Sequence, residues 1–117
     1  MTNPAEENAP HDPVLYHEII LALRPKSPGR YVDATLGAGG HAGGILEASS
    51  PDGYLLGMDL DPQALAIARQ RLARYGSRFS AVQRSYVHLR ETLAELGWQG
   101  VDGIVVDLGV SSMQIDT

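Results

Sequence analysis

The sequence predicts an α/β domain of Rossmann-like type, in which helices flank a parallel sheet. Three observations support this fold class. Short apolar segments of strand character alternate with segments whose apolar residues have helical spacing. A glycine-rich turn follows the first of these strands. The segments 54–60 and 101–108 are apolar almost throughout, as buried parallel strands are.

The first half of the chain contains two predicted helices and one strand. Residues 14–23 show helical spacing and end before Pro25. A strand is predicted at 30–35, followed by the turn 37–40 and a helix at about 41–49. A strand, a glycine turn and a helix in this order can present backbone amides to a ligand.

The second half continues the alternation. After the strand 54–60, a helix is predicted to begin at Pro62, with Asp61 as its N-cap, and to run to Gly76. Right-handed crossovers, and a ligand site between the first and fourth strands, predict four parallel strands in the order 3-2-1-4. The last three elements are a strand at 79–84, a helix at 87–96 and a strand at 101–108.

Length and composition exclude several classes of protein. With 117 residues, 44% apolar and 20% charged, the chain should form one globular domain, not a disordered polyelectrolyte or a collagen-like repeat. The absence of cysteine excludes disulfides, thiolate metal sites and a cysteine nucleophile. No apolar run has membrane-spanning length. Residues 1–12 are polar and acidic and lack the features of a targeting signal, which predicts a disordered tail on a cytoplasmic protein.

Charge is distributed unevenly along a chain whose net charge is −5. Residues 62–90 contain six of the nine basic residues and none of the fourteen acidic ones. Such a stretch can form a phosphate-contacting face, but its spacing favours a solvated helix face and a strand edge. The six residues are Arg69, Arg71, Arg74, Arg78, Arg84 and Arg90.

The first candidate site is the glycine turn that precedes the second predicted helix. Gly37, Gly39 and Gly40 allow close approach of a ligand to the backbone, and the helix start at His41 offers unpaired N–H groups. Gly37-x-Gly39-x-x-Ala42 also fits the glycine/alanine form of the dinucleotide-binding fingerprint. A tight turn without a ligand is the alternative.

The second candidate is Asp59, at the end of the strand 54–60 and 22 residues after Gly37. An acid in this position can accept hydrogen bonds from ribose hydroxyls. The alternative is that it caps the helix beginning at Pro62, but Asp61 fits that role better. The glycine turn and Asp59 together predict a ligand that contains a nucleoside.

The third candidate is Asp107, at the carboxyl end of the fourth strand, where it should face the same site as Gly39 and Asp59. Its carboxylate can hold a substrate amine or accept a proton; alternatively, the amides of the following turn satisfy it. Asp33, within the first strand, suits a ligand that carries an amino-acid tail. This favours S-adenosylmethionine over a nicotinamide cofactor, with an NAD-dependent oxidoreductase as the alternative.

Four motifs in order resemble the MraW (RsmH) family, and the resemblance runs from His11 to the end of the chain. The last motif, combined with Gly39-Gly40-His41, is the specific part of the match. The four motifs are His11-x-Pro13-Val14-Leu15, Tyr31-Val32-Asp33-x-Thr35-x-Gly37-x-Gly39-Gly40-His41, Gly57-x-Asp59-x-Asp61-Pro62-x-Ala64 and Asp102-Gly103-Ile104-x-x-Asp107-Leu108-Gly109-Val110-Ser111-Ser112-x-Gln114-x-Asp116.

The resemblance implies an enzyme that transfers a methyl group from S-adenosylmethionine to the exocyclic N4 of a cytidine in small-subunit (16S) ribosomal RNA. Asp59 would bind the ribose, and Tyr86, where the family usually has phenylalanine, would pack against the adenine. Asp107 would act as the catalytic acceptor close to the transferred methyl group. The histidines lack metal-ligand spacing, and no metal is expected. The donor-binding positions carried over from the family are Gly39, Gly40, His41, Asp59, Tyr86, Asp107 and Gln114.

This sequence departs from the family in two respects. Met113 replaces a usual proline beside Gln114, and the family continues beyond Asp116. We therefore expect a truncated class I methyltransferase core, with residues 13–117 as the donor-binding half and the substrate insertion absent. Alone, this chain is expected to bind the donor without turnover. The family's contacts with ribosomal RNA or the 30S particle are expected to be made mostly by parts that are missing here. The chain is also expected to self-associate through the exposed fourth strand.

Overall fold

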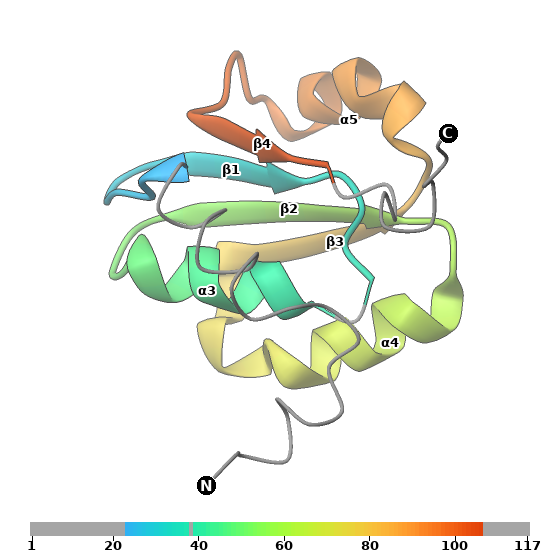
Figure 1. The fold of residues 1–117 in the computed structure, drawn as a ribbon. Helices are drawn as coiled ribbons and strands as arrows, with labels where there is room; N and C mark the ends of the chain where they lie inside the picture. The colour runs from blue at the N-terminus through green and yellow to red at the C-terminus, as the bar shows by residue number, and fades with distance from the viewer. Residues whose placement is uncertain (1–22, 38, 107–117) are drawn as a thin grey trace, which may run out of the picture.

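The computed structural model describes residues 23–37 and 39–106. The tail predicted at 1–12 lies outside these residues; of the helix predicted at 14–23 only Leu23 is described, and it is helical. Strands and helices alternate along the chain (Figure 1). The elements are β1 (Arg30–Asp33), α3 (Gly40–Ala48), β2 (Tyr54–Asp59), α4 (Pro62–Arg71), the 3₁₀ helix η1 (Ala73–Arg78), β3 (Phe79–Gln83), the 3₁₀ helix η2 (Tyr86–His88), α5 (Leu89–Leu96) and β4 (Gly103–Val105).

The four strands form one parallel sheet in the order β3-β2-β1-β4, which confirms the predicted topology. Asp33 of β1 pairs with Gly57 of β2 and with Val105 of β4, and Asp59 of β2 pairs with Gln83 of β3. Because the strands are parallel, the segments that follow their last residues emerge at one edge of the sheet. The predicted site residues of the described chain follow these strand ends.

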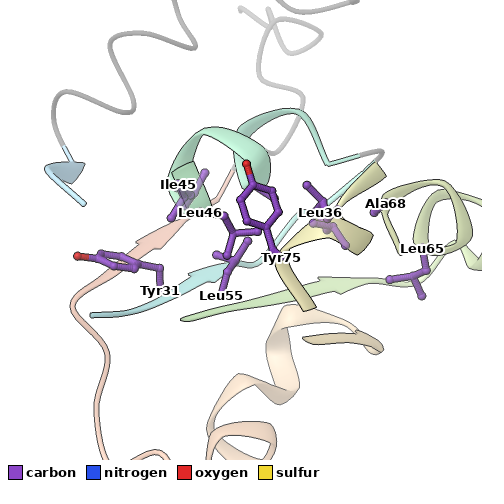
Figure 2. Close-up of a cluster of buried hydrophobic side chains, with 11 residues drawn as sticks. Tyr31, Leu36, Ile45, Leu46, Leu55, Leu65, Ala68 and Tyr75 are labelled. Carbon is purple, nitrogen blue, oxygen red and sulfur yellow. The ribbon is translucent and has the colours of Figure 1, made fainter. Parts of the chain in front are cut away.

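Helices cover both faces of the sheet, with α3 and α4 on one face and α5 on the other (Figure 1). Successive strand residues point to opposite faces. Tyr31 and Leu55 therefore pack with α3 and α4, whereas Val32 and Leu56 pack with Leu93 of α5. In the described part of the chain no helix is long and apolar enough to cross a membrane. Figure 2 shows the cluster on the α3 and α4 face, which includes Leu36, Ile45, Leu46, Leu65, Ala68 and Tyr75.

The predicted helix from Pro62 to Gly76 is wrong at its C-terminal end. α4 ends at Arg71, and the 3₁₀ stretch that follows contains Gly76 with φ 58° and ψ −134°. Glycine adopts such backbone angles without a Cβ clash, so the chain can leave the helix and enter β3 at Phe79.

Other boundaries also differ from the prediction. The helix predicted at 87–96 consists of two elements, η2 and α5, because the Ser85 hydroxyl accepts a hydrogen bond from the N–H of Val87 at 3.2 Å and starts a 3₁₀ turn. The first strand ends two residues early because its carboxyl end opens into the glycine turn. Of the predicted strand 101–108, the described residues pair over Gly103–Val105.

Most arginines of residues 62–90 contact the protein itself. The Arg69 guanidinium donates to the carbonyl of Ala81 at 3.1 Å, and that of Arg78 donates to the carbonyl of Leu46 at 2.6 Å. These contacts favour a structural role over a free phosphate-contacting face. Two further guanidinium groups donate to side chains, those of Arg74 and Arg84.

Candidate functional site

The segment 34–36, which leads into the glycine turn, lies across the carboxyl ends of three strands. Its backbone is held by hydrogen bonds from the N–H of Ala34 to the carbonyl of Val105 (2.8 Å) and from the N–H of Leu36 to that of Met58 (2.9 Å). The side chain of Leu36 is buried over Gly57, where a Cβ atom would lie 2.7 Å from the nearer Leu36 methyl group. The absence of a side chain at this position of β2 therefore lets the turn sit close to the sheet.

Two glycines of this turn have backbone angles that other residues rarely adopt. Gly37 has φ 56°, and Gly39, the N-cap of α3, has φ 92°. A Cβ atom at Gly39 would also lie 3.4 Å from a methyl group of Leu72. No side chain of the described residues caps α3, and the first amides of a helix have no acceptor within it. The start of α3 can thus donate backbone hydrogen bonds to a ligand.

Asp59 joins the glycine turn to the beginning of α4. One oxygen of its carboxylate accepts from the N–H of Gly37 at 2.7 Å, and the other accepts from the N–H of Asp61 at 2.9 Å. The Asp61 side chain in turn accepts from the N–H of Gln63 at 2.9 Å, so Asp61 caps α4 as predicted. Asp59 therefore does not cap α4, and each of its carboxylate oxygens already accepts one hydrogen bond. Each of its oxygens retains a lone pair for a further donor such as a ribose hydroxyl.

Tyr86 lies beyond the strand next to that of Asp59. Gln83, the last residue of β3, pairs with Asp59 in the sheet, and its side-chain amide donates to the carbonyl of Leu60 at 3.3 Å. Tyr86 begins η2 three residues later, and its side chain is 42% exposed. The acid predicted to bind ribose thus ends one strand, and the ring predicted to pack against adenine comes three residues after the end of the adjacent, directly paired strand.

The sequence analysis missed Leu60, which is 64% exposed despite being a large apolar residue. It lines a cavity of about 450 Å³ at this edge of the sheet. An apolar residue between Asp59 and Asp61, just past the end of a buried strand, was the available signal. The other residues lining the cavity are Gln83, Arg84, Ser85, His88, Glu91 and Glu95.

His41 and Asp33 are buried, with exposures of 6% and 1%. Burial of the His41 side chain favours a structural role for its ring, while its backbone N–H belongs to the first turn of α3. One oxygen of Asp33 accepts from the N–H of Thr35 at 3.2 Å, which helps to start the glycine turn. In residues 23–37 and 39–106 no group of three or more histidine or acidic side chains could hold a metal ion.

Asp107 and Gln114, and with them Met113, lie outside the described residues. The structure places the start of α3, Asp59 and Tyr86 at or just beyond the carboxyl ends of β1, β2 and β3. The roles predicted for all of these residues, and for Asp107 and Gln114, remain predictions. Asp107 comes two residues after Val105 in the sequence. Val105 pairs with Asp33 at the end of the sheet where the glycine turn begins.

Comparisons with known proteins bear on the family and the fold of the chain. A family model described as the MraW methylase family matches residues 8–117. The chain belongs to this family. Ribosomal RNA small subunit methyltransferase H of Geobacter sp. (strain M21) is 52% identical to it over 110 residues, which are 94% of this chain and 35% of that protein. This MraW-family chain thus spans about a third of the length of the curated relatives it matches.

Solved structures show the same fold at lower sequence identity. TrmN from Thermus thermophilus superimposes with a TM-score of 0.70 and 22% identity, covering 87% of this chain and 30% of the other. A SAM-dependent O-methyltransferase from Thermotoga maritima gives 0.67 and 18%, covering 89% and 39%. These likenesses confirm the predicted Rossmann-like methyltransferase fold. The family match favours a methyltransferase over the NAD-dependent alternative.

Proposed function

We propose that this MraW-family chain forms the donor-binding part of an S-adenosylmethionine-dependent methyltransferase that acts on the exocyclic N4 of a cytidine in small-subunit ribosomal RNA. The observation that carries the proposal is the position of the Asp59 carboxylate, which accepts a hydrogen bond from the N–H of Gly37. Asp59 is the last residue of β2 and pairs with Gln83 of β3, and Tyr86 comes three residues after Gln83. One acid is thereby bonded to the glycine turn and paired in the sheet with the strand that leads to an aromatic ring.

The described residues fit such a donor by their chemistry. Gly39, Gly40 and the backbone N–H of His41 would bind its methionine part, since the start of α3 has no side-chain cap among the described residues. Asp59 would accept from the ribose hydroxyls, and the half-exposed Tyr86 ring would stack on adenine. The donor supplies an activated sulfonium methyl group, so no metal is required.

Two residues outside the described part of the chain complete the proposed site. Asp107 would accept a hydrogen bond or proton from the cytidine N4 amine, whose lone pair is delocalised into the ring and must be oriented for in-line attack. Gln114 would line the same crevice near the methyl group. Both assignments rest on the family motif that contains them.

The substrate, the compartment and the oligomeric state are part of the same proposal. Ribosomal RNA or the 30S particle would be recognised mainly by regions that this chain does not contain, in the cytoplasm. The relatives are about three times as long, and residues 13–117 would correspond to the donor-binding half of their methyltransferase domain. The 117-residue chain should then bind the donor without methylating RNA. Among the described residues β4 pairs only with β1, and its other edge would allow self-association.

Two calorimetric titrations of the 117-residue chain, one with S-adenosylhomocysteine and one with NAD, test donor binding. The proposal expects saturable binding of the first and none of the second; binding of NAD alone would refute it. In a protein of the relatives' full length that carries this sequence, Asp107→Ala should abolish transfer of labelled methyl to 30S particles. Normal transfer by that variant would remove Asp107 from the catalytic role.

A further inference from the structure

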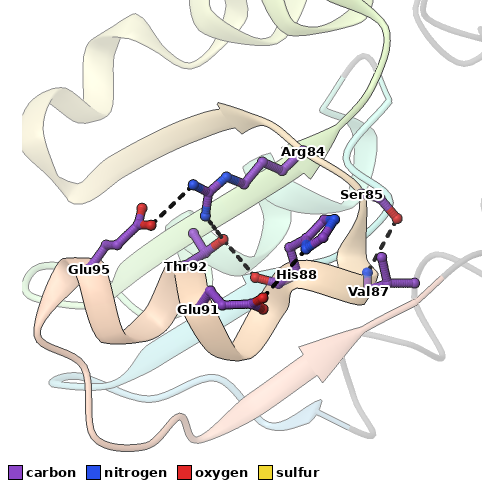
Figure 3. A network of polar contacts seen from close by, with 7 residues as sticks. All are labelled: Arg84, Ser85, Val87, His88, Glu91, Thr92 and Glu95. Atoms are coloured by element: carbon purple, nitrogen blue, oxygen red, sulfur yellow. Dashed lines mark hydrogen bonds and ion pairs between the residues drawn. The ribbon is translucent and has the colours of Figure 1, made fainter.

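Arg84 connects the end of β3 to helix α5. Its guanidinium donates to the hydroxyl of Thr92 at 2.9 Å and to the carboxylate of Glu95 at 3.0 Å, and both partners lie on α5 (Figure 3). The ion pair with Glu95 is solvent-accessible, with side-chain exposures of 38% and 61%. An exposed ion pair adds little stability. The hydrogen bond from Arg84 to the buried side chain of Thr92 is therefore the more important of the two for the structure.

The Thr92 hydroxyl receives one hydrogen bond and donates another. Thr92 is 2% exposed and is the buried residue of α5. While accepting from Arg84, its hydroxyl donates to the carbonyl of His88 at 2.8 Å. His88 is the last residue of η2. Two consecutive hydrogen bonds therefore link Arg84, just after β3, through Thr92 of α5 to the end of η2 (Figure 3). A hydroxyl can satisfy both bonds at once.

The other end of η2 is fixed by Ser85. Its hydroxyl accepts from the N–H of Val87 at 3.2 Å, and its carbonyl accepts from the N–H of His88 at 3.0 Å. A 3₁₀ turn of three residues has little stability of its own. The conformation of η2, and with it the direction of the half-exposed Tyr86 side chain, therefore depends on contacts at both of its ends.

We propose that Arg84 and Thr92 are positioning residues for donor binding. By holding the end of η2, they keep the Tyr86 ring in the orientation that stacks on the adenine of the donor. This inference rests on the proposed function and assigns a role to two residues that are not among the proposed donor-binding positions. A ring that is held in place before binding loses less conformational freedom when the ligand arrives, and binding is correspondingly tighter.

Two substitutions at Thr92 separate the hydroxyl from the packing. Thr92→Val keeps the shape and removes both hydrogen bonds, whereas Thr92→Ser keeps the hydroxyl. Titration with S-adenosylhomocysteine should show affinity reduced roughly five- to tenfold in Thr92→Val, the loss that corresponds to about one buried hydrogen bond. Thr92→Ser should restore most of it. Arg84→Met, which leaves the bond from Thr92 to His88 in place, should give a smaller loss and serves if Thr92→Val does not fold.

The same variants in a Tyr86→Ala background test whether the effect passes through the ring. If Arg84 and Thr92 act by positioning Tyr86, Thr92→Val or Arg84→Met should cause no further loss of affinity once the ring is gone. A loss of the same factor in that background, or wild-type affinity in both single variants, would overturn the inference while leaving donor binding intact. Failure of the unaltered chain to bind S-adenosylhomocysteine would instead overturn the proposed function, and the inference with it.

Discussion

Replacement of Asp59 by asparagine tests whether one carboxylate both holds the glycine turn and binds the donor. Asparagine has the same shape but only one acceptor oxygen. One of the two amide donors, those of Gly37 and Asp61, must therefore lose its partner. The Gly37 bond is partly buried and the Asp61 bond is exposed. We expect the remaining oxygen to face Gly37 and water to replace the lost acceptor at Asp61.

The cost follows from the nature of these two bonds. A hydrogen bond to a charged acceptor contributes about 1.5–3 kcal/mol, against about 1 kcal/mol for a neutral one. In Asp59→Asn one charged bond becomes neutral and the other is exchanged for water, so the free energy of unfolding should fall by about 2 kcal/mol. For a chain of this length that change lowers the melting temperature by about 8 °C. Loss of an acceptor for the ribose should also weaken S-adenosylhomocysteine binding about tenfold.

The assay is thermal and urea unfolding followed by fluorescence of Trp98, the single tryptophan, which packs against the sheet on the α5 side. Asp61→Asn is the matched control, because asparagine and aspartate are equally good N-caps and the change should cost only a few tenths of a kcal/mol. Equal stability of the two variants would refute the tie between Asp59 and the turn. Unchanged ligand affinity in Asp59→Asn would refute its role toward the ribose.

Three further predictions concern other parts of the chain. Gly39→Ala should lower the free energy of unfolding by about 1–2 kcal/mol, because a φ of 92° disfavours a residue with a Cβ atom. Gly43→Ala is the control: it lies inside α3, its Cβ atom would be 3.6 Å from a methyl group of Leu72, and it should be neutral or stabilising. Urea unfolding of both variants compares them. A hydrogen bond from its own backbone N–H, followed by the contact with His88, lowers the pKa of Glu91 below its ordinary value of 4.5. A carboxyl group whose pKa is lowered by folding stabilises the fold at a pH above its ordinary pKa, and this stabilisation is lost as the pH falls through the lowered pKa. The wild-type chain should therefore have a higher melting temperature than Glu91→Gln at pH 7 but not well below pH 4.5. A difference in melting temperature that does not depend on pH would contradict this. Ile104→Lys, at a 43% exposed position of β4, should reduce concentration-dependent association in sedimentation velocity, and a monomeric parent chain would contradict the expected pairing through that strand.

Local sequence patterns were sufficient for the elements and their order. The N-cap at Asp61 with Pro62 behind it, the apolar run of β2 and the glycine turn after β1 each depend on neighbours within a few residues. The crossover rule then arranged the strands correctly, because a parallel connection has one favoured hand. The relation between Asp59 and the glycine turn was also predictable in outline, since both follow strand ends.

Tertiary structure decided the contacts between segments that are distant along the chain. The bond from Gly37 to Asp59 spans 22 residues and depends on how β1 and β2 pair. The helix expected to reach Gly76 stops at Arg71 because the chain must turn back into β3, a requirement that helical spacing does not contain.

The same distinction applies to the contact between Arg84 and Thr92. The sequence determined that an arginine stands at the end of the third strand, where it was noted only as one of six in a basic stretch, and that a threonine lies in the helix that follows. Only the packing of α5 on the sheet brings the guanidinium to the buried hydroxyl and the hydroxyl to the end of η2. A pattern of period 3.6 specifies which face of a helix is buried, whereas a hydrogen bond between elements depends on where that face is placed.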